Sequence, residues 1–241
     1  MKSIIGHRGA AGLALENSLE SFRTALEYGV ESIEFDIRRT KDNKLVVLHD
    51  ADTGRVATKN VKVSQKTLDE LRHITLNNGE RLPSLDEVLD ILGNQPMCIE
   101  IKDNGCVGEL LRTLDRHPKA KAHVSVVSFE HNELQHLRER RPEIPIYVLE
   151  HYSPFEIIHT ARRLHAEGIG LNKTIINPIA YLLARRYGLK LYVYTVNSKL
   201  QAWFLHVLYP GVQICTNHPE LFKQRVKQPE RSTHRSGVAK G

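Results

Sequence analysis

Short β-rich runs alternate with amphipathic helical runs along most of this 241-residue chain, and this alternation restricts its fold more than any other feature. Two strands joined through a helical crossover lie parallel in one sheet, so repeated strand–helix units predict a parallel sheet covered by helices. The expected strands are 3–7, 31–37, 45–49, 97–102, 123–128, 145–149, 168–172, 190–195 and 211–215.

A closed α/β barrel of eight strands and eight helices, the TIM (β/α)8 barrel, fits both this order and the chain length, since such barrels typically have about 250 residues. The alternative is an open, doubly wound sheet. The glycine-rich turn G-x-G-x-x-G that usually follows the first strand of that fold is absent from the sequence, which favours the barrel.

The nine expected strands are one more than a barrel needs, and a hairpin explains the surplus. Only residues 40–44 separate the second strand from the third, which is too few for a helical crossover. If the hairpin closes symmetrically about Asp42 and Asn43, Asp36 lies opposite His49.

Residues 1–222 are predicted to form one barrel domain, in which the polar segment 51–83 is a small insert after the third strand without a clear core pattern. Residues that favour helix starts precede several of the expected helices. Asn17, Ser84 and Asn177 are predicted N-caps, because a short polar side chain at that position accepts a hydrogen bond from a free backbone N–H.

The segment 223–241 is a basic tail that carries +5 of the chain's formal net charge of +6. It has no apolar periodicity, so we expect a disordered, solvated end rather than a binding site for nucleic acid or another polyanion. The alternative, a non-catalytic protein that binds polyanions through this tail, stays open on the sequence alone.

Composition excludes several classes of protein. No apolar run approaches the roughly 20 residues of a membrane span, so no stable membrane insertion is expected. Three cysteines without metal-type spacing argue against a disulfide scaffold or a zinc site and favour a reducing compartment. The first strand begins near residue 3, which leaves no room for a targeting segment, and a cytoplasmic protein is expected.

The first candidate site residues are His7 and Arg8, which follow the first strand between two glycines. Histidine transfers protons near neutral pH, and the arginine guanidinium binds phosphate or carboxylate with two parallel hydrogen bonds. The alternative is a glycine turn that carries two polar surface residues.

Carboxylates form the second group of candidates. Glu34 and Asp36 share one face of an otherwise apolar strand, and Glu100 shares a strand face with Lys102. Buried carboxylates need compensation, and a hard divalent cation such as Mg²⁺ or Ca²⁺ takes oxygen ligands. Pairing of these carboxylates with Arg or Lys side chains is the alternative.

These strand ends, together with His49 after the third strand, would meet at the carboxyl-terminal mouth of a barrel, where barrel enzymes carry their active sites. His7 and His49 could then act as base and acid, while Arg8, Lys102 and the cation hold a phosphate. The chemistry that follows is metal-assisted phosphoryl transfer or phosphodiester hydrolysis.

An ordered set of short motifs resembles one enzyme family over residues 4–222. These motifs are His7-Arg8-Gly9, Glu16-Asn17-Ser18, Glu34-x-Asp36, Thr40-Lys41-Asp42, His49-Asp50 with Arg55, Pro83-Ser84-Leu85-x-Glu87, Glu100-Ile101-Lys102, Ser128-Phe129 and Tyr194-Thr195-Val196-Asn197. The chain is similar to the glycerophosphodiester phosphodiesterases.

The resemblance implies a TIM barrel that hydrolyses glycerophosphocholine, glycerophosphoethanolamine and similar small molecules to sn-glycerol 3-phosphate and an alcohol. It also implies one divalent metal ion (Mg²⁺ or Ca²⁺, with Mn²⁺ a further option) and a role for each candidate residue. The implied roles are metal ligand for Glu34, Asp36 and Glu100, acid or base for His7 and His49, and phosphate binding for Arg8 and Lys102. Either the glycerol 2-hydroxyl or water could attack phosphorus.

Two departures from the family pattern bear on the site. Tyr194 stands where a Trp is common, which alters the pocket wall that meets the alcohol group, and Asn217 stands where an Asp is usual. A lysophospholipase D-type activity is an alternative. It would need a hydrophobic approach surface, and no exposed amphipathic helix with a basic face is expected from the sequence.

Overall fold

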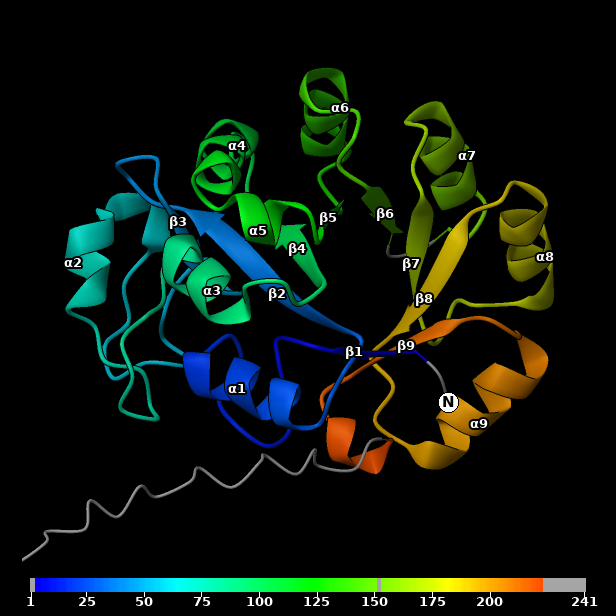
Figure 1. Cartoon of the computed structure of the whole chain (residues 1–241), viewed down its shortest axis with the longest axis horizontal. Helices are drawn as coiled ribbons and strands as arrows, with labels where there is room; N and C mark the ends of the chain where they lie inside the picture. The colour runs from blue at the N-terminus through cyan, green and yellow to red at the C-terminus, as the bar shows by residue number, and fades with distance from the viewer. Residues whose placement is uncertain (1–2, 151–152, 223–241) are drawn as a thin grey trace, which may run out of the picture.

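A computed structural model describes residues 3–150 and 153–222, and the strands of these residues form a single sheet that closes on itself (Figure 1). Its strands are β1 (Ile4–Gly6), β2 (Ser32–Arg39), β3 (Leu45–Val47), β4 (Met97–Ile101), β5 (Val124–Ser128), β6 (Ile146–Glu150), β7 (Gly168–Asn172), β8 (Lys190–Tyr194) and β9 (Gln213–Thr216).

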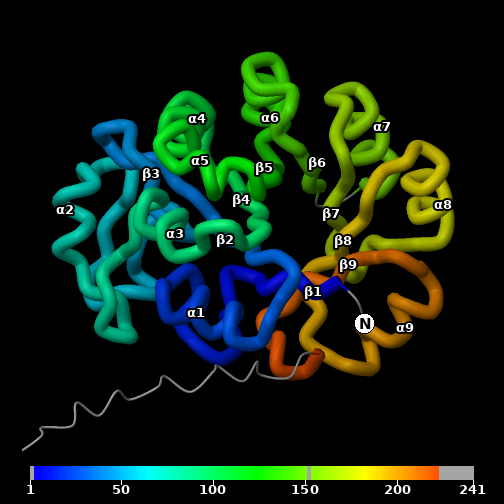
Figure 2. The backbone as a smooth tube through the Cα atoms, viewed as in Figure 1, coloured from blue at the N-terminus to red at the C-terminus, as the bar shows by residue number. Residues whose placement is uncertain are grey.

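The ring closes because β1 pairs in parallel with both β2 and β9, the first and last strands lying side by side in Figure 2. Eight parallel strands make the barrel, and β3 is the surplus strand, antiparallel to β2. The predicted TIM barrel and the predicted hairpin are both confirmed.

Helices surround the strands (Figure 1). They are α1 (Leu19–Glu27), α2 (Leu68–Arg72), α3 (Leu85–Leu92), α4 (Val107–Arg116), α5 (Pro118–Lys121), α6 (His131–Arg140), α7 (Glu156–Arg163), α8 (Pro178–Arg186) and α9 (Lys199–Leu208), with short 3-10 helices η1 (Val63–Gln65) and η2 (Pro219–Leu221). None of them, within the described residues, is long and apolar enough to cross a membrane.

The period-two pattern of β2 sets the direction of its side chains. Ile33, Phe35 and Ile37 belong to the large core between sheet and helices. Glu34 and Asp36 alternate with them and therefore point into the barrel. The inside of the barrel has its own small cluster of Ile5, Cys98, Val127, Leu149, Tyr192 and Cys215.

The hairpin register differs from the prediction by one residue. Ile37 pairs with Val47, and the Leu48 N–H donates to the Asp36 carbonyl at 3.1 Å, so Asp36 lies opposite Leu48 rather than His49. The turn is the reason: Thr40 N–H donates to the Lys44 carbonyl at 2.9 Å, which leaves three residues in the loop. The last of these, Asn43, has a left-handed φ of 59°.

The segment 51–83 holds η1 and α2 and packs around a small hydrophobic cluster of its own, which the sequence pattern did not indicate. That cluster comprises Val46, Leu48, Val56, Ala57, Val63, Leu71, Ile74, Leu76 and Leu82. Val46 and Leu48 connect the insert to the β3 edge of the barrel.

Ser84 and Asn177 are N-caps as predicted, and Ser84 forms a capping box with Glu87. The cap of α1 is Ser18 rather than Asn17, since the Ser18 hydroxyl accepts from the Ser21 N–H at 3.1 Å.

The sequence analysis expected no exposed amphipathic helix with a basic face. Helix α9 does present an apolar face to solvent, with Trp203 and Phe204. The predicted tail, 223–241, lies outside the described residues.

Candidate active site

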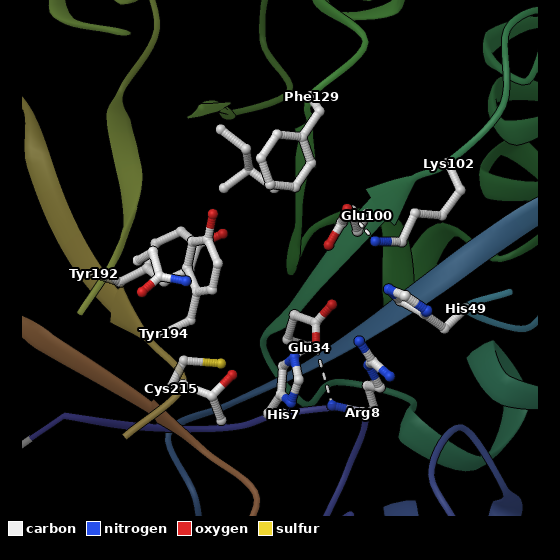
Figure 3. A pocket seen from close by; sticks show the side chains of 13 residues that line it. His7, Arg8, Glu34, His49, Glu100, Lys102, Phe129, Tyr192, Tyr194 and Cys215 are labelled. Carbon is white, nitrogen blue, oxygen red and sulfur yellow. Dashed lines mark hydrogen bonds and ion pairs between the residues drawn. The ribbon is translucent and has the colours of Figure 1, made fainter. Parts of the chain in front are cut away.

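A pocket opens at the carboxyl-terminal ends of the strands, and it brings the predicted site residues together (Figure 3). The residues of this group that line the pocket are His7, Arg8, Glu34, His49, Glu100, Lys102 and Tyr194. Asp36 completes the group, because it contacts both Arg8 and Lys102.

Three buried carboxylates form the centre of the site. Asp36 on β2 is in register with Glu100 on β4, and one oxygen atom from each of Glu34, Asp36 and Glu100 lies within 4.8 Å of the others. Among the described residues, Glu34 Oε1 and Asp36 Oδ1 accept no hydrogen bond, although both are buried. Such an oxygen-only cluster fits a hard divalent cation such as Mg²⁺ or Ca²⁺.

The ionisation of the three groups shows how much charge the cluster holds. Burial, followed by the charge of Asp36, raises the pKa of Glu34 well above its usual value and that of Glu100 to about 7. Burial acts on Asp36 in the same direction, but the charges of Lys102 and Arg8 outweigh it and lower the pKa of Asp36. The site therefore favours added positive charge.

Arg8 and Lys102 supply part of that charge. Arg8 Nε lies 3.3 Å from Asp36 Oδ2, and its backbone N–H donates to Glu34 Oε2 at 2.9 Å. Lys102 Nζ lies 3.2 Å from Asp36 Oδ1 and donates a short hydrogen bond to Glu100. Although burial opposes it, the neighbouring carboxylates raise the pKa of Lys102, so the ammonium stays charged.

Asn17 belongs to the site, a role that the sequence analysis missed. Its Nδ2 donates to Asp36 Oδ2 at 2.8 Å, and its Oδ1 accepts the Asp36 backbone N–H at 3.3 Å. The residue is buried and has a left-handed φ of 56°. The backbone hydrogen bond orients the Asn17 amide, and the second hydrogen bond holds the Asp36 carboxylate, which marks Asn17 as a positioning residue.

A chain of ion pairs connects Arg8 to His49. Glu16 accepts from Arg8 at 2.8 Å and from both terminal nitrogens of Arg55 at 2.7 Å. Arg55 Nε in turn donates to Asp50 Oδ2 at 2.7 Å. Asp50 Oδ1 lies 2.7 Å from His49 Nδ1, so the chain ends at the second histidine.

His7 is held by Asn217. The distance from His7 Nδ1 to Asn217 Oδ1 is 2.6 Å, and because the amide oxygen only accepts, Nδ1 carries the proton. Burial, followed by the charge of Arg8, lowers the pKa of His7 to about 4. His7 is therefore neutral near pH 7, and its Nε2, 3.9 Å from Glu34 Oε2, has a free lone pair.

His49 has a different environment. Its partner Asp50 is ionised, because hydrogen bonds from Arg55 lower the pKa of that carboxyl to about 2 against a smaller effect of burial. Burial lowers the pKa of His49 and Lys102 adds to that effect, while Asp36 and Asp50 oppose it. The carboxylate partner distinguishes His49 from His7, whose partner is a neutral amide.

Aromatic side chains line the other side of the pocket, facing His49 and Lys102 across it (Figure 3). The rings of Tyr192 and Tyr194 lie 5.9 Å apart. The Tyr194 hydroxyl is buried and has no hydrogen-bond partner among the described residues. This wall combines an apolar surface with one available polar atom.

Comparison of the sequence with known proteins finds one enzyme family that matches nearly the whole chain. The model of the glycerophosphoryl diester phosphodiesterase family matches residues 7–221. A glycerophosphodiester phosphodiesterase from Caldanaerobacter subterraneus subsp. tengcongensis is 30% identical over 242 residues, which cover 93% of this chain and 98% of that protein.

Two solved structures share the fold. A glycerophosphodiester phosphodiesterase from Thermotoga maritima superposes with a TM-score of 0.77 and 25% identity, covering 91% of this chain and 96% of the other. An Oleispira antarctica phosphodiesterase, solved in complex with the product sn-glycerol-3-phosphate, superposes with a TM-score of 0.86 and 20% identity, covering 92% and 95%.

Proposed function

This chain belongs to the glycerophosphoryl diester phosphodiesterase family, and we propose that it hydrolyses glycerophosphodiesters to sn-glycerol 3-phosphate and an alcohol. Glycerophosphocholine and glycerophosphoethanolamine are the substrates we expect. The observation that carries the proposal is the convergence, at one barrel mouth, of three buried carboxylates with Arg8, Lys102 and two histidines in different environments.

The proposed cofactor is one divalent metal ion, Mg²⁺ or Ca²⁺ with Mn²⁺ as a further option, held by Glu34, Asp36 and Glu100. Two buried carboxylate oxygens that accept no hydrogen bond among the described residues, Glu34 Oε1 and Asp36 Oδ1, and the raised pKa values of Glu34 and Glu100 support this choice of ligands. When bound, such an ion polarises a phosphoryl oxygen and offsets the charge that develops on it.

The charges of the site match a phosphodiester. Glu34, Asp36 and Glu100 are three negative charges when ionised, and Arg8 and Lys102 are two positive ones. With a divalent cation the sum is one positive charge, which suits the single negative charge of a phosphodiester. Arg8 and Lys102 then bind the phosphate oxygens through charge-assisted hydrogen bonds.

The two histidines take the two proton-transfer roles. His7 Nε2, unprotonated near neutral pH, accepts the proton of the hydroxyl that attacks phosphorus. His49 protonates the oxygen of the departing alcohol as its bond to phosphorus breaks. Burial lowers the pKa of His49, and ionised Asp50 together with the phosphate anion of the substrate favours its protonated form. The attacking hydroxyl belongs either to the glycerol 2-position or to water.

Tyr194 is proposed to contact the alcohol group of the substrate. Its ring forms part of the aromatic wall, and its buried hydroxyl is available for a hydrogen bond. An aromatic face also attracts a cationic group such as choline.

The proposed compartment is the cytoplasm. Cys98, Cys106 and Cys215 are all buried free thiols in the described residues, as a reducing environment favours.

The deciding experiment couples glycerol 3-phosphate release from several glycerophosphodiesters to its dehydrogenase. Lysophosphatidylcholine is tested separately by choline release, because its cleavage gives lysophosphatidic acid rather than glycerol 3-phosphate. We expect activity on the glycerophosphodiesters that a chelator abolishes and a divalent cation restores. Glu34→Gln should remove both activity and metal binding. Glu109→Gln is the matched control, since Glu109 is a buried carboxylate on α4 that pairs with Lys44 outside the site. Full activity after proven removal of the metal would contradict the metal assignment, and turnover of lysophosphatidylcholine alone would contradict the substrate.

A further inference from the structure

Helix α9 carries an apolar stripe on the side that faces away from the barrel. Its buried residues are Ala202 and Leu205, whereas Trp203 is 53% exposed. The exposed positions recur at helical spacing, so they form one continuous face. This outer stripe consists of Leu200, Trp203, Phe204, Val207 and Leu208.

The neighbouring helix α8 also exposes apolar side chains, Ile179 and Leu182, which are 60% and 63% exposed. Tyr181 of α8 holds the two helices together, because its ring lies 5.3 Å from that of Tyr209 and its hydroxyl donates to the Pro210 carbonyl at 2.7 Å. We call these seven exposed residues the α8–α9 patch. They are seven of the ten exposed large hydrophobic side chains in the described residues.

The segment of chain that carries the patch has charge of one sign. Between Glu167 and Glu220 the chain has no Asp or Glu, although it has 28 acidic residues in all. The same segment contains five basic residues, and each of them is exposed. They are Lys173, Arg185, Arg186, Lys190 and Lys199.

We propose that the α8–α9 patch docks the protein on the surface of a bilayer that contains anionic phospholipids. A helix that lies in the membrane interface has an apolar face with aromatic residues and basic residues beside it, and α9 with its surroundings has both. Trp is favoured at the level of the head groups. The segment offers no carboxylate that anionic head groups would repel, and each Lys or Arg near the surface adds attraction.

Other occupants fit less well. A second copy of the chain would place the same segment on both sides of a two-fold contact, and that segment has five basic residues and no acid to pair with them. A nucleic acid would place its phosphates against the apolar stripe, whose side chains, apart from the Trp203 indole N–H, have no hydrogen-bond donor. An anionic lipid surface matches the apolar and the basic components together.

The patch is separate from the candidate active site, since none of its seven residues lines the pocket. Docking therefore adds a location to the proposed hydrolase without changing its chemistry. Activity on a water-soluble diester serves as the test that a patch variant is folded.

Trp203 is the only tryptophan of the chain, so intrinsic fluorescence reports on the patch itself. The full-length protein is titrated with phosphatidylcholine vesicles that contain or lack phosphatidylglycerol. We expect a blue shift and co-sedimentation with the anionic vesicles, weakened by salt. Phe204→Ser with Val207→Ser should lower the vesicle partition coefficient by about tenfold or more, because two apolar side chains no longer enter the interface. Arg185→Ser with Arg186→Ser should reduce the preference for phosphatidylglycerol.

Phe155→Ser is the matched control, since Phe155 is 50% exposed but lies outside the patch, and it should leave binding unchanged. A further full-length variant replaces the six Lys and Arg residues of 223–241 by Ser. Loss of binding in that variant, with binding retained in the Phe204/Val207 variant, would overturn the proposal in favour of the tail. A concentration-dependent dimer that the Phe204/Val207 variant abolishes, without vesicle binding, would overturn it in favour of self-association. A protein that binds neither kind of vesicle would also overturn it.

Discussion

The contact between His7 and Asn217 makes the proposed base testable with one substitution. Asn217→Asp keeps the length of the side chain and an oxygen at the position now 2.6 Å from His7 Nδ1, but it adds a negative charge. A carboxylate favours the protonated imidazole, whereas the neutral amide adds no charge. We expect the variant to need a higher pH for the same fraction of neutral His7.

The size of the effect follows from the distance. An opposite charge at hydrogen-bond range shifts a titration by about 1–3 pH units, so the acid limb of kcat/KM should move upward by that amount. In the folded protein the pKa of His7 is about 4, against an ordinary value of 6.5. Its folded pKa is depressed, so the native protein loses stability as pH falls from 6.5 through 4, and the substitution should reduce that loss.

The assay measures kcat/KM for glycerophosphocholine as a function of pH, at saturating divalent cation. Asn197→Asp is the matched control. Asn197 accepts the Asn217 backbone N–H at 2.9 Å, so this substitution adds a negative charge nearby and leaves the contact between Asn217 and His7 in place. Asn217→Ala removes the oxygen that accepts the hydrogen bond from His7 Nδ1. It should lower kcat and leave the acid limb of the pH profile nearly where it is. A folded Asn217→Asp enzyme with an unmoved acid limb would refute the assignment of His7 as the base.

Three further predictions test other parts of the site. His49→Ala should lower kcat by ~10²-fold or more and leave the calorimetric affinity for Mg²⁺ unchanged, so loss of metal would contradict its role as an acid. Asn17→Ala removes the 2.8 Å hydrogen bond to Asp36 and should weaken metal binding by ~10–100-fold, whereas unchanged affinity would exclude a positioning role. When a chelator has removed the metal, the pKa of Glu100 is about 7 in the folded protein, against an ordinary value of 4.5. The folding stability that this group contributes is therefore present below pH 4.5 and is lost as pH rises through 7, by up to roughly 3 kcal/mol. Thermal melts of Glu100→Gln should show a smaller pH dependence, and equal dependence in both proteins would count against this explanation.

The barrel and most of its site were predictable because they depend on local patterns. Alternation in β2 sends Ile33 and Phe35 to the helices and leaves Glu34 and Asp36 for the interior, whatever the rest of the chain does. Parallel strands then bring their carboxyl ends to one mouth. The residues that follow those ends therefore meet without any knowledge of the contacts between them.

The hairpin register was not predictable from alternation alone. It depends on the three-residue loop, in which Asn43 adopts a left-handed backbone. A two-residue loop centred on Asp42 and Asn43 is equally compatible with the sequence. Such a loop would place His49, instead of Leu48, opposite Asp36. His49 still acts electrostatically on Asp36, because it lies just beyond the last paired residue of β3, Val47.

The role of Asn17 depends on a contact across 19 positions of sequence. Asn17 and Ser18 are both good N-caps, and the cap pattern does not distinguish between them. Once Ser18 caps α1, Asn17 is released from that role, and its left-handed backbone is the conformation in which its side chain bonds to Asp36. Where two neighbouring residues could both cap a helix, as Asn17 and Ser18 could, the one that does not cap the helix is free to bond elsewhere.

Helix α9 shows that an apolar pattern alone does not predict which side of a helix is buried. Its apolar residues are numerous enough to cover two opposite faces, and periodicity does not say which face meets the sheet. The barrel takes the face with Ala202 and Leu205, since a small residue there allows close approach, and the larger face with Trp203 and Phe204 remains outside. The amino-acid pattern sets how many apolar faces a helix has, and packing against the core of the barrel domain selects the one that is buried. The apolar face that remains outside, within a segment that has no acidic residue, is the reason to look for a lipid surface rather than for a second layer of protein.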